Sequence, residues 1–118
     1  MTYVDGFLLP VPKGKIEEYR AIAKKASEVW KDHGALDYRE CVGDDVNPQF
    51  GRSFADAAGA GPDDTVIFSY IVYNSREHRD EVNAKVMEDP RIANMPPESM
   101  PFDCSRMFYG GFKTIVEL

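Results

Sequence analysis

The sequence predicts an α+β fold in which one four-stranded antiparallel sheet carries two helices on a single face. Segments rich in aromatic and branched residues alternate with segments of helical period, in the order strand, helix, strand, strand, helix, strand. No repeat or low-complexity linker interrupts this order. A chain of 118 residues supports one hydrophobic core, so residues 1–118 are expected to form a single domain.

The first half of the chain supplies two strands and the longest helix. Residues 3–11 form a strand that prolines end. Residues 15–33 switch to a helical period, and Gly34 follows as a left-handed cap. Residues 35–42 alternate between polar and apolar positions, which is typical of an edge strand.

The second half begins with a long connection. Residues 43–64 are rich in Gly, Asp, Ala and Pro, which indicates either a mobile segment or a binding loop. Residues 65–73 are apolar on both faces, as expected of a central strand. Asn74 or Ser75 can cap the helix that follows, which runs to about residue 88.

The end of the chain completes the sheet. One further helical turn is expected over residues 91–95, before a proline-broken loop. Residues 106–116 form the last strand, where Gly110 and Gly111 indicate a bulge or a close backbone approach. The complete order, βαββαβ, is the ferredoxin-like arrangement.

The first, third and last strands carry apolar residues on both faces, whereas two helices can cover only one. A monomer rarely leaves a large apolar sheet face in water. The sequence therefore predicts a homodimer that pairs through the uncovered face.

Composition argues against several classes of partner. The net charge of −6 and the absence of a basic patch predict no nucleic-acid binding. No basic leader precedes an apolar stretch, and the apolar run near the start is too short for a signal peptide or a membrane span. A cytoplasmic protein without membrane contact is expected. Cys41 and Cys104 are then expected to be reduced thiols, with a disulfide as the alternative.

The candidate site lies in a predicted cleft between the helices and the sheet. Helical spacing places His78, Arg79 and Asn83 beside the apolar stripe of the second helix. His78 could act as a general base, and Arg79 could hold a carboxylate. Arg106 and Tyr109 are expected to complete the cleft. The alternative is that His78 and Arg79 cap strand ends or join a surface ion-pair network.

Two acids lie on otherwise apolar strands. Asp5 and Glu40 must be paired or have a raised pKa if they are buried, so each is either part of a structural ion pair or an acid/base group. Arg106 and Tyr109 could face either acid. The aromatic residues Trp30, Tyr19 and Phe7 are interpreted as core packing rather than as an aromatic box.

No metal site and no cofactor are expected. The chain has two histidines and no Cys/His ligand spacing, and it lacks phosphate-loop and dinucleotide motifs. His33 fits better as a cap on the end of the first helix.

Four segments resemble the YbaA-like family, an uncharacterised family of the dimeric alpha/beta barrel superfamily. They are YVDGFLLPVPK, EVWKDHGALDYRECVGDDV, TVIFSYIVYNSREHRDEVNAKVM, and MPFDCSRMFYGGF with IVEL. Residues 47–62 depart most from the family pattern. The resemblance implies a ferredoxin-like protomer whose sheet packs on that of a second copy. The superfamily includes monooxygenases, isomerases, haem proteins and ligand-sensing domains, so the fold does not choose the chemistry.

The leading hypothesis is a homodimeric domain that binds a small molecule in the cleft. The alternative is an enzyme without a cofactor, similar to a monooxygenase or an isomerase, with His78 as base and Arg79 or Arg106 stabilising an anion. A third hypothesis is a structural or partner-binding dimer, which is expected if side chains fill the cleft.

Overall fold

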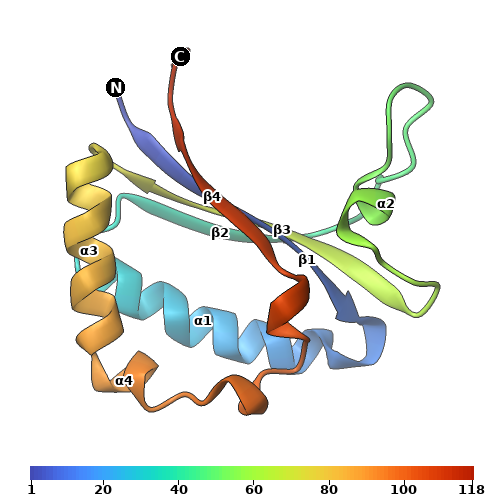
Figure 1. Ribbon diagram of the computed structural model, residues 1–118, viewed down its shortest axis with the longest axis horizontal. Helices are drawn as coiled ribbons and strands as arrows, with labels where there is room; N and C mark the ends of the chain where they lie inside the picture. Colours follow the sequence, from blue (N-terminus) through green and yellow to red (C-terminus); the bar gives the residue numbers. More distant parts are fainter.

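The computed structural model describes all residues from 1 to 118 and confirms the ferredoxin-like fold (Figure 1). One antiparallel sheet has the strand order β2-β3-β1-β4. Helices α1 and α3 lie on the same face of this sheet. The strands are β1 (Tyr3–Pro12), β2 (Asp37–Val42), β3 (Asp64–Tyr73) and β4 (Phe108–Lys113). The helices are α1 (Ile16–Asp32), α2 (Phe54–Ala58), α3 (Arg76–Glu88) and α4 (Pro90–Ala93). Short 3₁₀ turns cover Lys13–Lys15, Pro97–Ser99 and Cys104–Arg106.

Strand β1 is central because it pairs with both β3 and β4. Its register with β3 runs from Tyr3 opposite Tyr73 to Pro12 opposite Asp64. Side chains alternate between the two faces of a strand, so Asp5 and every second residue of β1 face the helices. The helix-facing side of the sheet contributes to both clusters of the hydrophobic core.

The two long helices bury apolar stripes against this side. Val29 of α1 and Val86 of α3 are completely buried, and each such side chain contributes about 1.5–3 kcal/mol. The Ser75 side chain accepts a hydrogen bond from the backbone N–H of His78 at 3.1 Å, which confirms the predicted cap. Gly34 follows α1 with a φ of +111°, a conformation that favours glycine, as predicted.

The structure differs from the sequence prediction at four places, the first of which is β2, since it begins at Asp37 and not at residue 35. The connection 43–64 contains α2, which Ser53 caps and Gly59 ends with a φ of +67°. A five-residue helix is too short to show a helical period, so the pattern could not predict it. The predicted turn 91–95 begins earlier, because Asp89 caps α4 with Pro90 at its first position. Strand β4 covers 108–113 and not 106–116, since Asp103 caps a 3₁₀ turn that includes Arg106.

The other face of the sheet is apolar and uncovered in the protomer. Three aromatic residues on it, Phe68, Phe108 and Phe112, are 45%, 58% and 62% exposed. The terminal segments and the segment that carries α2 project from the sheet on this side, away from α1 and α3 (Figure 1). No helix has the length and apolar character needed to cross a membrane.

Candidate functional site

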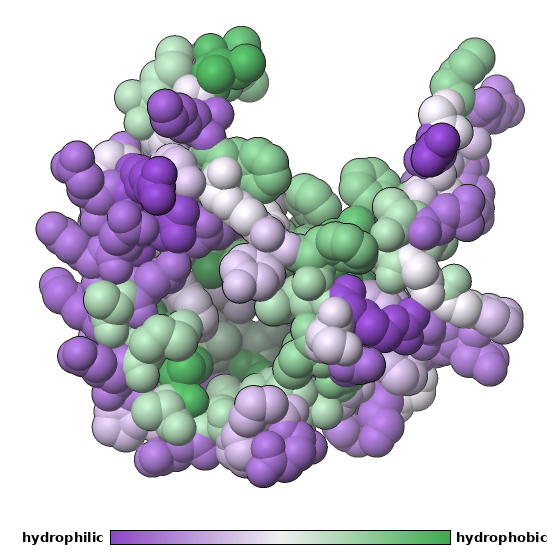
Figure 2. All heavy atoms as spheres, viewed as in Figure 1, coloured by the Kyte–Doolittle hydropathy of each residue, from purple (hydrophilic) through white to green (hydrophobic).

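A cavity of about 750 Å³ lies between the helix-facing side of the sheet, α1, α3 and the segment after α4. The molecule is hollowed between β4 and that segment, and apolar residues surround the hollow (Figure 2). Of the 23 lining residues, 16 are hydrophobic, so the few polar groups stand out. These polar groups gather in two networks, one around Asp5 and one around Glu40.

The first network centres on Asp5, which is only 7% exposed. Its carboxylate oxygen Oδ1 lies 3.6 Å from Nε of Arg79 in α3. The same guanidinium donates a hydrogen bond from Nη2 to the Tyr3 hydroxyl at 2.9 Å and lies over the Tyr3 ring. The hydrogen bond with Tyr3 is the main cause of a raised pKa for Arg79. A buried carboxylate thus has a partner of opposite charge within the cavity wall.

Asn83 extends this network toward α1. Its Nδ2 lies 3.5 Å from Oδ2 of Asp5, and its Oδ1 accepts hydrogen bonds from the Trp30 indole at 3.1 Å and the Tyr73 hydroxyl at 3.2 Å. Burial and the Asp5 carboxylate raise the pKa of the Tyr73 hydroxyl, which therefore stays a donor. The network joins β1, β3, α1 and α3 at one end of the cavity.

Gly111 makes this end of the cavity possible. Asp5 pairs with Gly111 of β4, and a Cβ atom at Gly111 would overlap the Tyr3 hydroxyl and lie 2.7 Å from Nη2 of Arg79. Glycine at this position leaves room for the Tyr3 and Arg79 side chains to approach the backbone closely, and a close approach is one of the two alternatives predicted for this pair of glycines. A Cβ at Gly110 would have no atom nearer than 3.9 Å.

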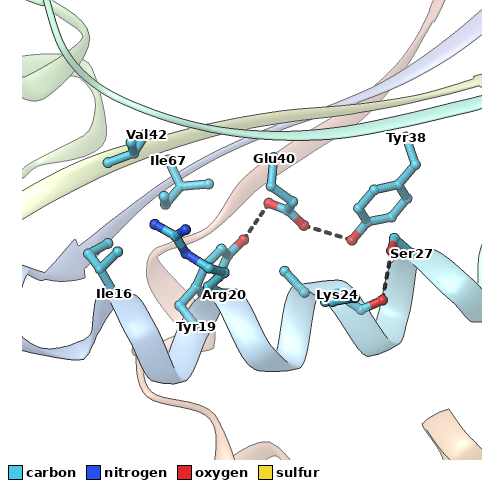
Figure 3. A pocket seen from close by; sticks show the side chains of 10 residues that line it. Ile16, Tyr19, Arg20, Lys24, Ser27, Tyr38, Glu40, Val42 and Ile67 are labelled. Carbon is cyan, nitrogen blue, oxygen red and sulfur yellow. Dashed lines mark hydrogen bonds between the residues drawn. The ribbon is translucent and has the colours of Figure 1, made fainter.

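The second network centres on Glu40 of β2 (Figure 3). Its Oε1 accepts a hydrogen bond from the Tyr19 hydroxyl, and its Oε2 accepts one from the Tyr38 hydroxyl, each at 2.7 Å. Burial, followed by the Glu40 charge, raises the pKa of both tyrosine hydroxyls. Both hydroxyls therefore stay protonated and donate to the carboxylate.

The Glu40 network forms a wall shared by two cavities. A smaller pocket of about 420 Å³ lies on its other side, between α1 and the β2 edge. Both spaces are lined by Tyr19, Tyr38 and Glu40, while Arg20 and Lys24 line the smaller one alone. Glu40 is therefore accessible from an inner apolar cavity and from an outer pocket with cationic side chains.

A methionine-rich wall borders the cavity opposite the sheet. Methionine side chains are unbranched and adapt to irregular shapes. This wall comes from the end of α3, α4 and the segment that leads to β4, and it consists of Met87, Ile92, Met95, Met100, Phe102 and Met107.

The structure brings together some of the predicted site residues and separates others. Arg79, Asn83 and Tyr109 line the cavity, and the Tyr109 ring stacks on Phe7 with 6.2 Å between centroids. His78 does not line it, because its Nδ1 accepts a hydrogen bond from the backbone N–H of Asn74, just before α3 begins. Arg106 does not line it either.

The guanidinium of Arg106 reaches away from the cavity. It donates to the carbonyl oxygen of Gly59 and lies 3.7 Å from a carboxylate oxygen of Asp64. Arg106 therefore ties the last 3₁₀ turn to the segment after α2. Arg106, which the sequence allowed to face Asp5 or Glu40, contacts neither acid, since Arg79 lies against Asp5 and two tyrosines donate to Glu40.

Aromatic residues that the sequence assigned to packing also line the cavity. Phe7, Tyr19 and Trp30 are all among its lining residues. Phe7 and Trp30 pack against the core cluster that contains Val29 and Val86. Tyr19 belongs to the other core cluster, which contains Leu9. These three side chains therefore contact the hydrophobic core on one side and line the cavity on the other.

Two further predicted residue groups lie outside the cavity. His33 follows the last residue of α1, and its Nε2 lies 2.8 Å from Oδ2 of Asp89. Asp89 also accepts hydrogen bonds from Arg91, and these, followed by the His33 contact, lower its pKa. This cluster joins the ends of α1 and α3. Both cysteines are free and exposed, and no group of three or more potential metal ligands is present.

Comparison with known proteins places the chain in a family. The family model described as "Protein of unknown function (DUF1428)" matches residues 2–104. The uncharacterized protein YbaA of Escherichia coli K12 is 45% identical over 117 residues, which cover 99% of both chains, and YbaA of Shigella flexneri matches equally. A NIPSNAP family protein from Agrobacterium tumefaciens C58 shares the fold, with a TM-score of 0.59 and 16% identity over 98% of this chain and 89% of that chain. The chain therefore belongs to the DUF1428 family, together with the YbaA proteins that the sequence motifs resemble.

Proposed function

We propose that the protein binds a small, mainly apolar molecule in the cavity between the sheet and helices α1 and α3. The observation that carries this proposal is the cavity itself. Its volume of about 750 Å³ falls within the range of about 300–1,000 Å³ for small-molecule sites. A mostly hydrophobic lining with a few convergent polar groups is also typical of such sites.

The position of His78 favours binding over the predicted His78-dependent enzyme. The ring of His78 is engaged at the start of α3 and contributes nothing to the cavity wall. A purely structural domain is expected to fill the space between its layers with side chains, because protein interiors pack as densely as organic crystals. Space left open at this size supports a ligand site.

Filling the cavity tests the proposal. Ala26 of α1 lines the cavity, whereas Ala21 of the same helix is exposed. In a thermal-shift screen against uncharged aromatic alcohols, a ligand at one hundred times its Kd adds about 2.7 kcal/mol, or about 10 °C for a chain of this size. Ala26→Phe is expected to abolish the shift and Ala21→Phe to keep it. A shift that survives Ala26→Phe, or the absence of any shift, would contradict the proposal.

A second candidate is an enzyme that removes a proton from its bound substrate without a cofactor, as in a monooxygenase or isomerase. The observation in its favour is a carboxylate, Glu40, on the cavity wall between two tyrosine donors. A positioned carboxylate is a competent general base. In this reading Glu40 replaces His78 as the base. Exchange of an acidic C–H of a bound ketone for deuterium, lost in Glu40→Gln, is the result that would favour it.

We further propose that two copies pair through the uncovered face of the sheet. Phe68, Phe108 and Phe112 lie on this face, and aromatic residues are enriched at the centres of interfaces. The terminal segments and the segment that carries α2 project on the same side and lie at opposite ends of the face, where they could contact a second copy (Figure 1). A two-fold dimer would bury the same patch of both copies. It would thereby remove the apolar face from water without a different partner.

The mass in solution tests the homodimer. Phe108→Lys places a charge on the proposed interface and is expected to give a monomer by light scattering. Leu36→Lys is the matched control, since Leu36 is 51% exposed and lies outside every strand. A wild-type monomer at micromolar concentration, or a dimer that tolerates Phe108→Lys, would overturn this proposal.

The exposed, unpaired thiols of Cys41 and Cys104 support a reducing compartment such as the cytoplasm. Free exposed thiols are readily oxidised in an oxidising compartment. Labelling of both thiols in freshly lysed cells, without added reductant, is the expected result.

A further inference from the structure

We propose that the cavity prefers a ligand with a cationic nitrogen on an apolar body, and that Glu40 is the group that selects the cation. This inference rests on the proposed ligand-binding function and names the class of ligand. It follows from the charges in the cavity wall, the free hydrogen-bonding capacity of Glu40, and the aromatic surfaces beside it.

The cavity wall carries one more negative charge than positive charge. Asp5, Glu40 and Arg79 are its charged residues. Arg79 lies within 4.0 Å of the Asp5 and Asp80 carboxylates and donates to the Tyr3 hydroxyl, while its Nε makes no hydrogen bond. Asp5 and Arg79 compensate each other, so Glu40 is the charge in the cavity wall without a counter-ion there. Arg20 and Lys24 line the smaller pocket on the other side of Glu40.

Glu40 has no cationic partner within the ion-pair distance of 4.0 Å. Its contacts are the two tyrosine hydroxyls, one on each carboxylate oxygen. A carboxylate offers about four acceptor positions, so about two remain free. An anionic ligand would meet this charge in a low-dielectric space, whereas an ammonium group could donate to the free positions.

Arg79 is too far from Glu40 to supply the missing charge. Glu40 pairs with Ser69 of β3, and Asp5 pairs with Ile71 of the same strand. The two acids therefore lie two strands and two residues apart, which corresponds to about 12 Å between their Cα atoms. A ligand nitrogen near Glu40 would lie well away from the Arg79 guanidinium.

The rest of the wall suits the apolar body of such a ligand and can also attract its cation. Trp30 and Tyr38 lie side by side, with 6.0 Å between ring centroids, and Tyr38 donates to Glu40. Aromatic faces attract cations, and they do so more strongly when water is excluded. The net charge of −6 of the whole chain also favours the approach of a cation.

Three probes with the same apolar body and different head groups test the inference: 3-phenylpropylamine, 3-phenylpropan-1-ol and 3-phenylpropionate. Calorimetry on the wild-type protein at neutral pH is expected to show the amine binding about tenfold tighter than the alcohol, and the carboxylate binding more weakly than either. Equal affinities of amine and alcohol, or tightest binding of the carboxylate, would overturn it.

The variant Glu40→Gln keeps the size of the side chain and removes its charge. It is expected to lose the tenfold advantage of the amine over the alcohol, because the charge that attracts the amine is gone. Glu28→Gln is the control, because Glu28 is exposed on α1 and its loss changes the net charge equally. An amine advantage that survives Glu40→Gln would refute the role of Glu40.

The outcomes separate this inference from the proposed function. If the alcohol binds and the amine gains nothing, the preference for a cation is wrong while the ligand site stands. If none of the three probes binds at millimolar concentration, both are wrong. Should Glu40→Gln fail to fold, the order of the three affinities on the wild-type protein still decides.

Discussion

Replacing Arg79 by methionine tests whether the Asp5–Arg79 pair holds one end of the cavity together. The side chains of Asp5 and Arg79 are 10% and 23% exposed, so the pair is largely removed from water. Methionine fills much of the volume of the arginine stem and removes the charge. The Asp5 carboxylate would then be buried without a cation.

The expected cost follows from this burial. Removal of one partner from a buried ion pair costs about 3–5 kcal/mol. The distance of 3.6 Å between Nε and Oδ1 and the partial exposure of Arg79 place the expected loss near the lower value, about 3 kcal/mol. At about 4 °C per kcal/mol for a chain of this length, the Tm should fall by about 12 °C.

A double-mutant cycle separates the pair from other effects. Asp5→Asn alone is expected to cost about 2 kcal/mol, because Arg79 can still turn toward Asp80, which lies 3.5 Å from its Nε. In the double variant neither charge is left unpaired, so its loss should fall about 2 kcal/mol short of the sum of the single losses. Urea denaturation measures all three values. Losses that add to within about 0.5 kcal/mol would refute the coupling.

Three further predictions concern single positions. Gly111→Ala places a Cβ 2.7 Å from Nη2 of Arg79 and should cost about 1–3 kcal/mol in urea denaturation, while Gly110→Ala should cost clearly less; equal losses would contradict the close approach. The hydrogen bonds to Asp89 lower its pKa, so their stabilisation is complete above the ordinary Asp pKa and is lost progressively as the pH falls from there through the lowered pKa of the folded state. The Tm gap between wild type and Asp89→Asn should therefore shrink steadily below about pH 4, and a constant gap would contradict this. Gly34→Ala forces an alanine to a φ of +111° and should cost about 1–2 kcal/mol, so an unchanged Tm would show that the turn relaxes freely.

Hydrophobic period predicted the elements of the fold because each long element buries one face. The alternation in residues 37–42 and the helical spacing in α1 record which side of each element meets the core. Strand order then follows from connection rules, since few topologies accommodate βαββαβ. Short elements such as α2 have too few residues to show a helical period of hydrophobicity. For this reason the sequence pattern predicted a loop in that segment.

The same reasoning found only part of the cavity wall. Spacing along α3 placed Arg79 and Asn83 correctly, because both lie on the side of Val82 and Val86. It did not predict the position of the His78 ring, which turns back toward the residue before the cap of α3. There the ring accepts a hydrogen bond from the backbone N–H of Asn74. Arg106 precedes β4 in a 3₁₀ turn, where no period indicates a direction.

The contact between Tyr19 and Glu40 could not be predicted from the sequence. Tyr38 and Glu40 are two residues apart on one strand, so their common face could be predicted. Tyr19 comes from α1, and its approach depends on how that helix sits across the sheet. This packing geometry arises from side-chain shape rather than from any local pattern.

The pairing of β1 with β4 has a consequence for the order in which the molecule folds. Asp5 and Gly111 are far apart in the sequence and yet lie side by side in the sheet. Contacts between distant residues close a long loop, so they form at a higher entropic cost than local contacts do. This end of the cavity is therefore expected to form late in folding.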